Sequence, residues 1–146
     1  MRKNLNKSIQ LNASPQKVWE VLQADKYTRI WYAEFKEGSF AETDWKLESK
    51  AIFNDGMGNG MIGRIVVSDP YRNISIEYDG LLMNGVEDID SEDAQHVKGG
   101  REVYNLVESE GGTQLTVGGD ISEEYFDMMS AKWDKALLKI KELLEE

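Results

Sequence analysis

The stretch "EEYFDMMSAKWDKALLKIKELLEE", residues 123–146, carries the longest helical pattern in the chain and decides its fold. Apolar residues recur there at spacings of four and three, which places them on one face of a helix. These residues are Tyr125, Met129, Trp133, Leu137, Ile140 and Leu144. Ser122, Glu123 and Glu124 make a favourable helix N-terminus. At a rise of 1.5 Å per residue the apolar face extends for about 37 Å, so we predict a long helix that crosses a whole sheet.

The two halves of this helix differ in their apolar side chains. The first half is aromatic and Met-rich, whereas the second half carries Leu and Ile. One interpretation is a large packed core, because aromatic residues dominate cores generally. The other is a pocket that opens to water at the aromatic end, where Met can repack around varied ligands. In that second interpretation Trp133, at the change from aromatic to aliphatic packing, forms the floor of the pocket.

The first 35 residues predict a strand followed by two short helices. Residues 3–12 alternate apolar and polar, as in a half-buried strand. Ser14 and Pro15 then favour a helix from about residue 15 to residue 24, with Ser14 as its cap. Residues 25–35 predict a second helix that is capped by Asp25 and turns Ile30 and Trp31 inward.

Short alternating runs separated by turn residues replace the helical period from residue 43 to residue 121. We expect strands at 43–47, 50–55, 60–68, 73–80, 101–109 and 113–119. The separators have the composition of hairpin turns, so the sheet is antiparallel. The whole chain, 1–146, is predicted to be a single α+β domain. Its curved antiparallel sheet of about six to seven strands wraps around the long C-terminal helix.

Composition excludes several classes of protein. The net charge is -10, and residues 74–146 hold 18 Asp or Glu against 6 Lys or Arg, a balance that disfavours nucleic acid and anionic membranes. The absence of cysteine excludes disulfides and thiolate metal sites. No run approaches the ~18 apolar residues of a membrane span, so we expect no membrane insertion and a soluble, cytoplasmic protein.

Three sequence motifs resemble binding or catalytic sites, but the residues around each motif do not support that function. Gly58, Gly60 and Gly63 match the dinucleotide pattern G-x-G-x-x-G, but a strand follows where a helix is required, so we predict a hairpin turn. Residues 86–100 are acidic but lack the Gly and Glu that a calcium loop needs, so we predict a long mobile loop. His96 is the only histidine and lies in that loop, which disfavours a metal or catalytic role.

Several segments resemble the single-domain bacterial members of the SRPBCC, or START-like, superfamily. They are "LNASPQKVWEVL", "IWYAEF", "DWKLESKAIF", "MIGRIVVSDPYRNISIEY", "GGTQLTV" and "SAKWDKALLKIKELLEE". The most similar subgroup is named for homology to the activator of the ninety-kilodalton heat-shock chaperone ATPase. The resemblance runs from about Leu5 to Leu144 and implies a helix-grip fold, with a hydrophobic cavity between the sheet and the last helix.

The resemblance also implies which residues line that cavity. Carried onto this sequence, they are Trp31, Tyr32, Phe53, Tyr78, Tyr104, Tyr125, Met129 and Trp133. Glu102 departs from the family pattern, because the family has an apolar residue on this inward face shared with Tyr104 and Leu106. Two explanations stay open: Glu102 places a carboxylate at the cavity mouth, or the strand begins later.

Three functional hypotheses follow. The first is the non-catalytic binding of a small hydrophobic or amphipathic molecule in the cavity, with no catalytic residue, no metal and no other cofactor. The second, from the subgroup name alone, is an interaction protein whose partner is a chaperone. The third is an enzyme of the cyclase or hydrolase kind that uses the same cavity.

Overall fold

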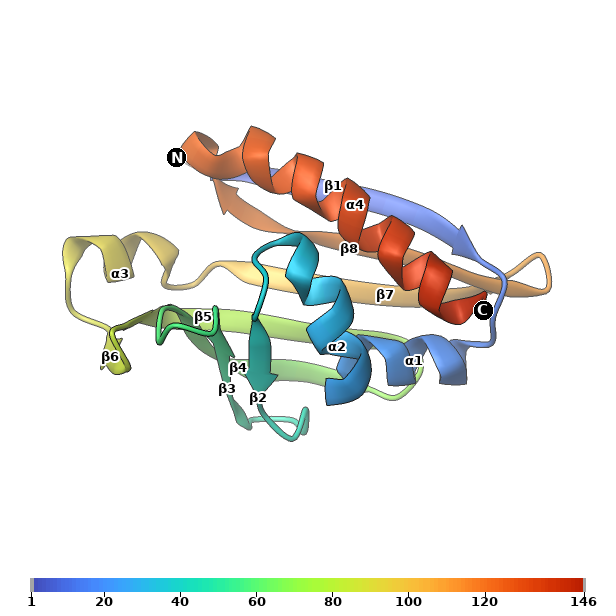
Figure 1. The fold of residues 1–146 in the computed structure, drawn as a ribbon, viewed down its shortest axis with the longest axis horizontal. Helices are drawn as coiled ribbons and strands as arrows, with labels where there is room; N and C mark the ends of the chain where they lie inside the picture. The colour runs from blue at the N-terminus through green and yellow to red at the C-terminus, as the bar shows by residue number, and fades with distance from the viewer. Residues whose placement is uncertain (1, 146) are drawn as a thin grey trace.

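The computed structural model describes residues 2–145 and confirms an α+β fold with a long C-terminal helix on an antiparallel sheet (Figure 1). Met1 and Glu146, the two ends of the predicted domain, lie outside the described residues. Within residues 2–145 the sheet has eight strands, more than the six to seven predicted, because β2 and β6 are three-residue strands that the sequence pattern did not indicate.

The elements follow one another along the chain in the order that the sequence predicts, with short additions. The strands are β1 (Arg2–Leu11), β2 (Phe40–Glu42), β3 (Lys50–Asn54), β4 (Gly60–Asp69), β5 (Asn73–Met83), β6 (Val86–Asp88), β7 (Arg101–Ser109) and β8 (Gly112–Ser122). The helices are α1 (Pro15–Gln23), α2 (Asp25–Trp31), α3 (Glu92–Val97) and α4 (Phe126–Leu144), with single 3-10 turns η1 (Tyr32–Glu34) and η2 (Glu123–Tyr125).

The sheet has the strand order β1-β8-β7-β5-β4-β3-β2, and β6 pairs with β5 outside this path. Helices α1, α2 and α4 lie on one face of the sheet, with α4 running diagonally over β1 and β8 (Figure 1). Their apolar residues form one core with the inward residues of the strands. This arrangement is the predicted helix-grip fold. Among the described residues, no helix combines the length and the apolar character needed to cross a membrane.

The first predicted helix is confirmed, and the second needs correction. The Ser14 hydroxyl accepts the Lys17 N–H at 3.2 Å and Pro15 opens α1, as expected. Asp25 is not the cap of α2: it is the first helical residue, and its carboxylate pairs with Arg29 at 2.7 Å. Trp31 is buried as predicted, but Ile30 is 44% exposed.

The strand predicted at residues 43–47 is wrong. This segment is a turn in which Trp45 has a φ of 62°. The Thr43 hydroxyl accepts the Trp45 N–H at 3.2 Å, and the Asp44 carboxylate accepts the Lys46 N–H at 2.9 Å. Such local bonds satisfy the backbone without a sheet, so the strand β2 ends just before them.

The long loop predicted at residues 86–100 is also wrong, because this segment forms β6 and α3. The Ser91 hydroxyl caps α3 by accepting the Ala94 N–H at 3.1 Å, and the Asp88 carboxylate accepts two N–H groups in the preceding turn. Ala94 is fully buried, apart from the main core. Ser91 therefore caps the helix and Asp88 closes the turn before it, and a count of the charges in the segment does not reveal either role.

The glycine-rich pattern at residues 58–63 is a hairpin connection, as predicted. Gly60 is the first residue of β4 and pairs with Asn54 of β3. A Cβ atom at Gly60 would lie 1.8 Å from the carbonyl oxygen of Phe53, and its φ is 153°. The glycine is needed here for the close approach of two strands, and no helix N-terminus follows that could hold a pyrophosphate.

Trp133 joins α4 to the rest of the core. It is 2% exposed, and its ring centroid lies 4.9 Å from that of Phe35, 5.9 Å from Tyr104 and 6.0 Å from Trp31. Toward the C-terminus of α4 the buried residues are Ala136, Leu137 and Ile140. Toward the N-terminus the burial ends sooner than predicted, because Tyr125 belongs to the turn η2 and is 52% exposed.

We predict that Trp133→Ala lowers the free energy of unfolding by about 3–5 kcal/mol, because three aromatic rings lose a fully packed partner. A cost of only about 1–2 kcal/mol is expected where a side chain already faces a gap. Denaturant unfolding measures the difference. Leu137→Ala, one turn along the same buried face, is the control and should cost about 2–5 kcal/mol. A clearly smaller loss for Trp133→Ala than for Leu137→Ala would place a gap beside the indole.

Candidate functional site

A carboxyl group lies on the inward face of the sheet, where the sequence placed Glu102. Strand β7 begins at Arg101, so Glu102, Tyr104 and Leu106 share one face of that strand. The Tyr104 hydroxyl donates to Glu102 Oε2 at 2.6 Å. The Tyr78 hydroxyl, from the neighbouring strand β5, donates to Glu102 Oε1 at 3.2 Å. Of the two explanations for this departure from the family pattern, the structure supports the inward carboxylate and not a later strand.

The environment of this carboxyl group changes its acidity and that of the tyrosines. Burial raises the pKa of Glu102, and the bonds from Tyr104 and Tyr78 oppose that rise without cancelling it. Burial, together with the negative charge of Glu102, holds the pKa of Tyr32, Tyr78 and Tyr104 well above the usual tyrosine range. The three hydroxyl groups therefore keep their protons at neutral pH, and Glu102 is the first group of this cluster to ionise as the pH rises.

The aromatic residues predicted to line a cavity form a layer around this carboxyl group. Trp31 contacts the rings of Tyr32, Tyr104 and Trp133, at centroid distances of 4.5, 6.5 and 6.0 Å. On the other side of Glu102, the Tyr78 ring lies 6.1 Å from that of Phe53. Six of the predicted residues are thereby linked by ring contacts, and the two tyrosines of the sheet join them to Glu102.

Two predicted residues lie apart from this network, and two contributors were missed. Tyr125 is more than half exposed in η2, and Met129 is half-buried on α4. Phe35, which packs on Trp133, and Trp45, whose ring lies 6.2 Å from that of Phe53, were not predicted. The spacing of four between Trp31 and Phe35 is a helical signal that indicates a shared face. The position of Trp45 follows from an irregular turn that carries no such signal.

The layer is closed at one end and partly open at the other. At the C-terminal half of α4, Leu115, Ala136 and Ile140 are fully buried. At the N-terminal half the inward side chains keep some contact with solvent, and they include Tyr32, Phe53, Tyr78, Glu102 and Met129. A ligand would therefore approach at the Glu102 end.

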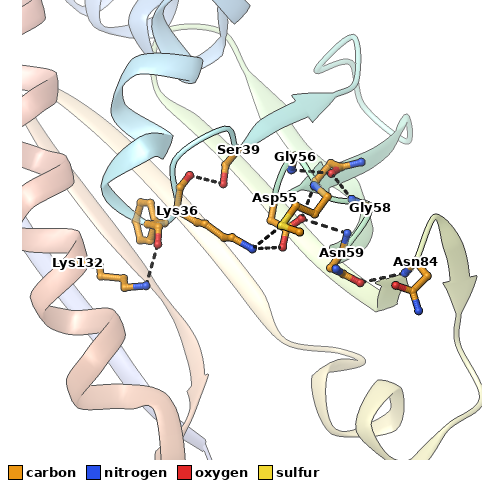
Figure 2. A network of polar contacts seen from close by, with 11 residues as sticks. Lys36, Ser39, Asp55, Gly56, Gly58, Asn59, Asn84 and Lys132 are labelled. Carbon is orange, nitrogen blue, oxygen red and sulfur yellow. Dashed lines mark hydrogen bonds and ion pairs between the residues drawn. The ribbon is translucent and has the colours of Figure 1, made fainter.

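Polar contacts hold together the segments at this open end (Figure 2). The Lys132 ammonium of α4 donates to the Phe35 carbonyl at 2.8 Å, and the next residue, Lys36, pairs with Asp55 at 2.8 Å. The Asp55 carboxylate also accepts the N–H groups of Met57 and Asn59 in the β3–β4 turn. The hydrogen bond from Lys36 is the main reason that the pKa of Asp55 is lowered, and the two backbone N–H groups add to the effect. These contacts connect α4, the segment after η1 and the β3–β4 turn.

The same chain of contacts continues to the β5–β6 turn. The Asn59 side chain accepts the Asn84 N–H at 2.9 Å (Figure 2). The Gly58 carbonyl also accepts the Gly85 N–H at 2.8 Å. Four segments that are distant in sequence are thus fixed relative to one another. We call this set of contacts, from Lys132 to Asn84, the rim network.

A hollow lies away from the aromatic layer, between the start of α1, the β4–β5 turn and β7. It is an open groove of about 1040 Å³ lined by residues such as Pro15, Tyr71 and Val107. None of the nine predicted ligand-binding residues lines it. It contains no buried polar group comparable to Glu102, so we assign the candidate site to the aromatic layer.

The chemistry available at the candidate site is limited to one carboxyl group and three phenols. Within residues 2–145, no group of three or more His, Cys, Asp or Glu side chains is arranged to hold a metal ion. A carboxyl group whose pKa is raised can accept a hydrogen bond or exchange a proton with a bound molecule. The arrangement therefore suits recognition of a polar group at the end of an apolar molecule.

The raised pKa of Glu102 predicts an unusual dependence of stability on pH. The folded chain binds this proton more tightly than the unfolded chain. The contribution of protonated Glu102 to the free energy of unfolding is therefore complete below its ordinary pKa of 4.5, and it is lost as the pH rises through the raised pKa of the folded protein. We expect Glu102→Gln to be more stable than the parent at neutral pH and to lose that advantage in acid. Thermal unfolding of both proteins across a pH series measures the difference.

Glu77→Gln is the control for this pH series and should behave in the opposite way. Glu77 lies on the other face of β5, where its bond from Arg101 and the charge of Arg64 lower its pKa. Its contribution is present above its unfolded pKa and is lost as the pH falls, so Glu77→Gln should destabilise the protein most at neutral pH. A Glu102→Gln variant less stable than the parent at neutral pH would contradict the assigned environment.

The fold is similar to several solved bacterial structures. A protein of Chromobacterium violaceum has 15% sequence identity and a TM-score of 0.70, with 99% of each chain covered. The Aha1 dimer from Colwellia psychrerythraea has 18% identity and a TM-score of 0.70, with 98% of this chain and 96% of that chain covered. CalU16 from Micromonospora echinospora has 14% identity and a TM-score of 0.71, with 99% and 77% covered. At these identities the likeness concerns the fold.

The sequence itself assigns the family. No curated protein matches the chain. The family model described as "Activator of Hsp90 ATPase homolog 1-like protein" matches residues 12–145, which is nearly all of the chain and includes every residue of the candidate site. The chain therefore belongs to the activator of Hsp90 ATPase homolog 1-like family, as its resemblance to the SRPBCC superfamily implied.

Proposed function

We propose that this protein binds a small amphipathic molecule at the Glu102 end of the aromatic layer, between the sheet and α4. The observation that carries the proposal is the Glu102 carboxyl group, which is held by two tyrosine hydroxyls within a layer of aromatic rings. Binding sites for small molecules combine mostly apolar walls with a few convergent polar groups. The carboxyl group and the phenols supply the polar end, and the rings supply the apolar wall.

The distribution of burial supports this position for the ligand. A ligand that replaces water over half-buried aromatic side chains gains about 25 cal/mol for each Å² of apolar surface removed from water. In the aromatic layer such side chains lie at the end near Tyr78 and Met129, whereas Ile140 and Leu115 at the opposite end are fully buried. The rim network fixes the segments around this end, which reduces the entropy cost of ordering them when a ligand binds.

The test is an NMR titration of the labelled protein with a panel of soluble amphipathic molecules. We expect saturable shifts of the Tyr78, Tyr104 and Met129 signals. Met129→Trp should fill the open end and weaken binding at least about tenfold, a loss of ~1.4 kcal/mol. Leu138→Trp is the matched control, because Leu138 belongs to the same helix and is 59% exposed. Binding that survives Met129→Trp unchanged, or shifts confined to the α1 groove, would refute the proposed site.

A second candidate function is interaction with a chaperone of the Hsp90 type, which the family name suggests. Its structural support is a group of exposed apolar side chains on the two turns that the rim network joins: Met57, Met83 and Val86 are 72%, 49% and 66% exposed. Exposed apolar groups on neighbouring turns are a common feature of protein contact surfaces.

This candidate predicts that the protein co-purifies with the Hsp90-type chaperone of its own organism and changes its ATPase rate. Met57→Ser with Val86→Ser should abolish both effects and leave ligand binding unchanged, because both side chains point to solvent. The exposed Leu138→Ser is the control for a general loss of apolar surface. An unchanged ATPase rate together with no complex by gel filtration would exclude this function.

A further inference from the structure

Among the residues that the structure describes, Glu102 has no cationic partner. Its two oxygens accept one tyrosine hydroxyl each, and none of the ion pairs formed by residues 2–145 includes it. A carboxylate has about four acceptor positions, so about two remain available. By contrast, Glu77, which points to the opposite face of the sheet, pairs with both Arg64 and Arg101.

The neighbours of Glu102 cannot neutralise its charge. Tyr32, Tyr78 and Tyr104 are neutral donors, and their hydroxyls keep their protons because burial and the nearby carboxylate raise the pKa of each. A buried charge without a counter-ion is costly, and it is stabilised either by binding a proton or by the approach of a cation. A cationic ligand can therefore supply the counter-ion that Glu102 lacks.

The surroundings of Glu102 suit an organic cation better than a metal ion. Ammonium groups are attracted to aromatic rings, and the rings of Tyr78 and Tyr104 reach Glu102 through their hydroxyl ends. The partner of Glu102 on β8 is Gly119, which contributes no side chain to that flank. A metal ion would require further oxygen or nitrogen ligands, which the described residues do not supply here.

We propose that the ligand of this site is a cationic amphiphile, whose ammonium group binds the Glu102 carboxylate among the tyrosine rings and whose apolar part covers the open end of the aromatic layer. This inference rests on the proposed binding function and adds the charge of the ligand to it. The net charge of -10 acts in the same direction, because it attracts cations and repels fatty acids and other anions.

The experiment compares three probes that share one apolar part: phenylbutylamine, phenylbutanol and phenylbutyrate. Their dissociation constants are measured by NMR titration at neutral pH and low salt. We expect the amine to bind at least about tenfold more tightly than the alcohol, and the carboxylate to bind most weakly. Glu102→Gln keeps the shape of the side chain but removes its charge, so it should bring the amine within about twofold of the alcohol, a difference of ~0.4 kcal/mol.

Glu77→Gln is the matched control, because it removes one negative charge next to Tyr78 but on the outer face of the sheet. It should keep the preference for the amine, and the one-dimensional NMR spectrum of each variant verifies that it is folded. Equal binding of amine and alcohol by the parent would refute the charge preference and leave the binding function intact. A preference that survives Glu102→Gln would refute the role of this carboxylate. Failure of all three probes to bind would overturn the binding function together with this inference.

Discussion

The packing of Trp133 against rings from two other parts of the chain is the contact on which the architecture depends. It brings α4 onto Tyr104 of the sheet and Trp31 of α2 at the same point. Helix α4 has a single apolar face, and only a broad sheet can cover a face of that length. The strand order and the position of the two short helices follow from the need to surround this helix on one side of the sheet.

Trp133 also separates two parts of the core that differ in how completely their side chains are buried. Beyond Trp133, aliphatic side chains of α4, β8 and β1 such as Ile140, Leu115 and Leu11 are fully buried. Before it, the larger and partly polar rings leave inward side chains half-buried. A core of bulky aromatic groups packs less completely at its margin than one of Leu and Ile, because their shapes and polar tips restrict how they can interlock. The candidate site lies at that margin, which is where a binding function is least costly to the stability of the core.

Glu102 departs from the family pattern, and its role can be inferred only from the side chains around it. On an outward position it would be one of 27 acidic residues and would indicate little. On the inward face it accepts two phenol hydroxyls from two strands and has no cationic partner among the described residues. Burial, together with the charge of Glu102, raises the pKa of the tyrosines around it. Removing the Glu102 carboxylate from water costs free energy, and a residue that only stabilises the fold would not need a charge there. This is the physical reason to connect Glu102 with the recognition of a ligand.

The sequence by itself determined the α+β class, the long C-terminal helix, the helix cap at Ser14 and the inward face of β7, because each depends on local periodicity or on a side chain bonding to its own backbone. Only the tertiary structure decided the turn around Trp45, the helix within residues 86–100 and the exposure of Ile30 and Tyr125. It also decided that Tyr78 and Tyr104 meet at Glu102, because that meeting depends on how β5 and β7 pair. Strand pairing depends on contacts between distant segments, and no local pattern in the chain encodes them.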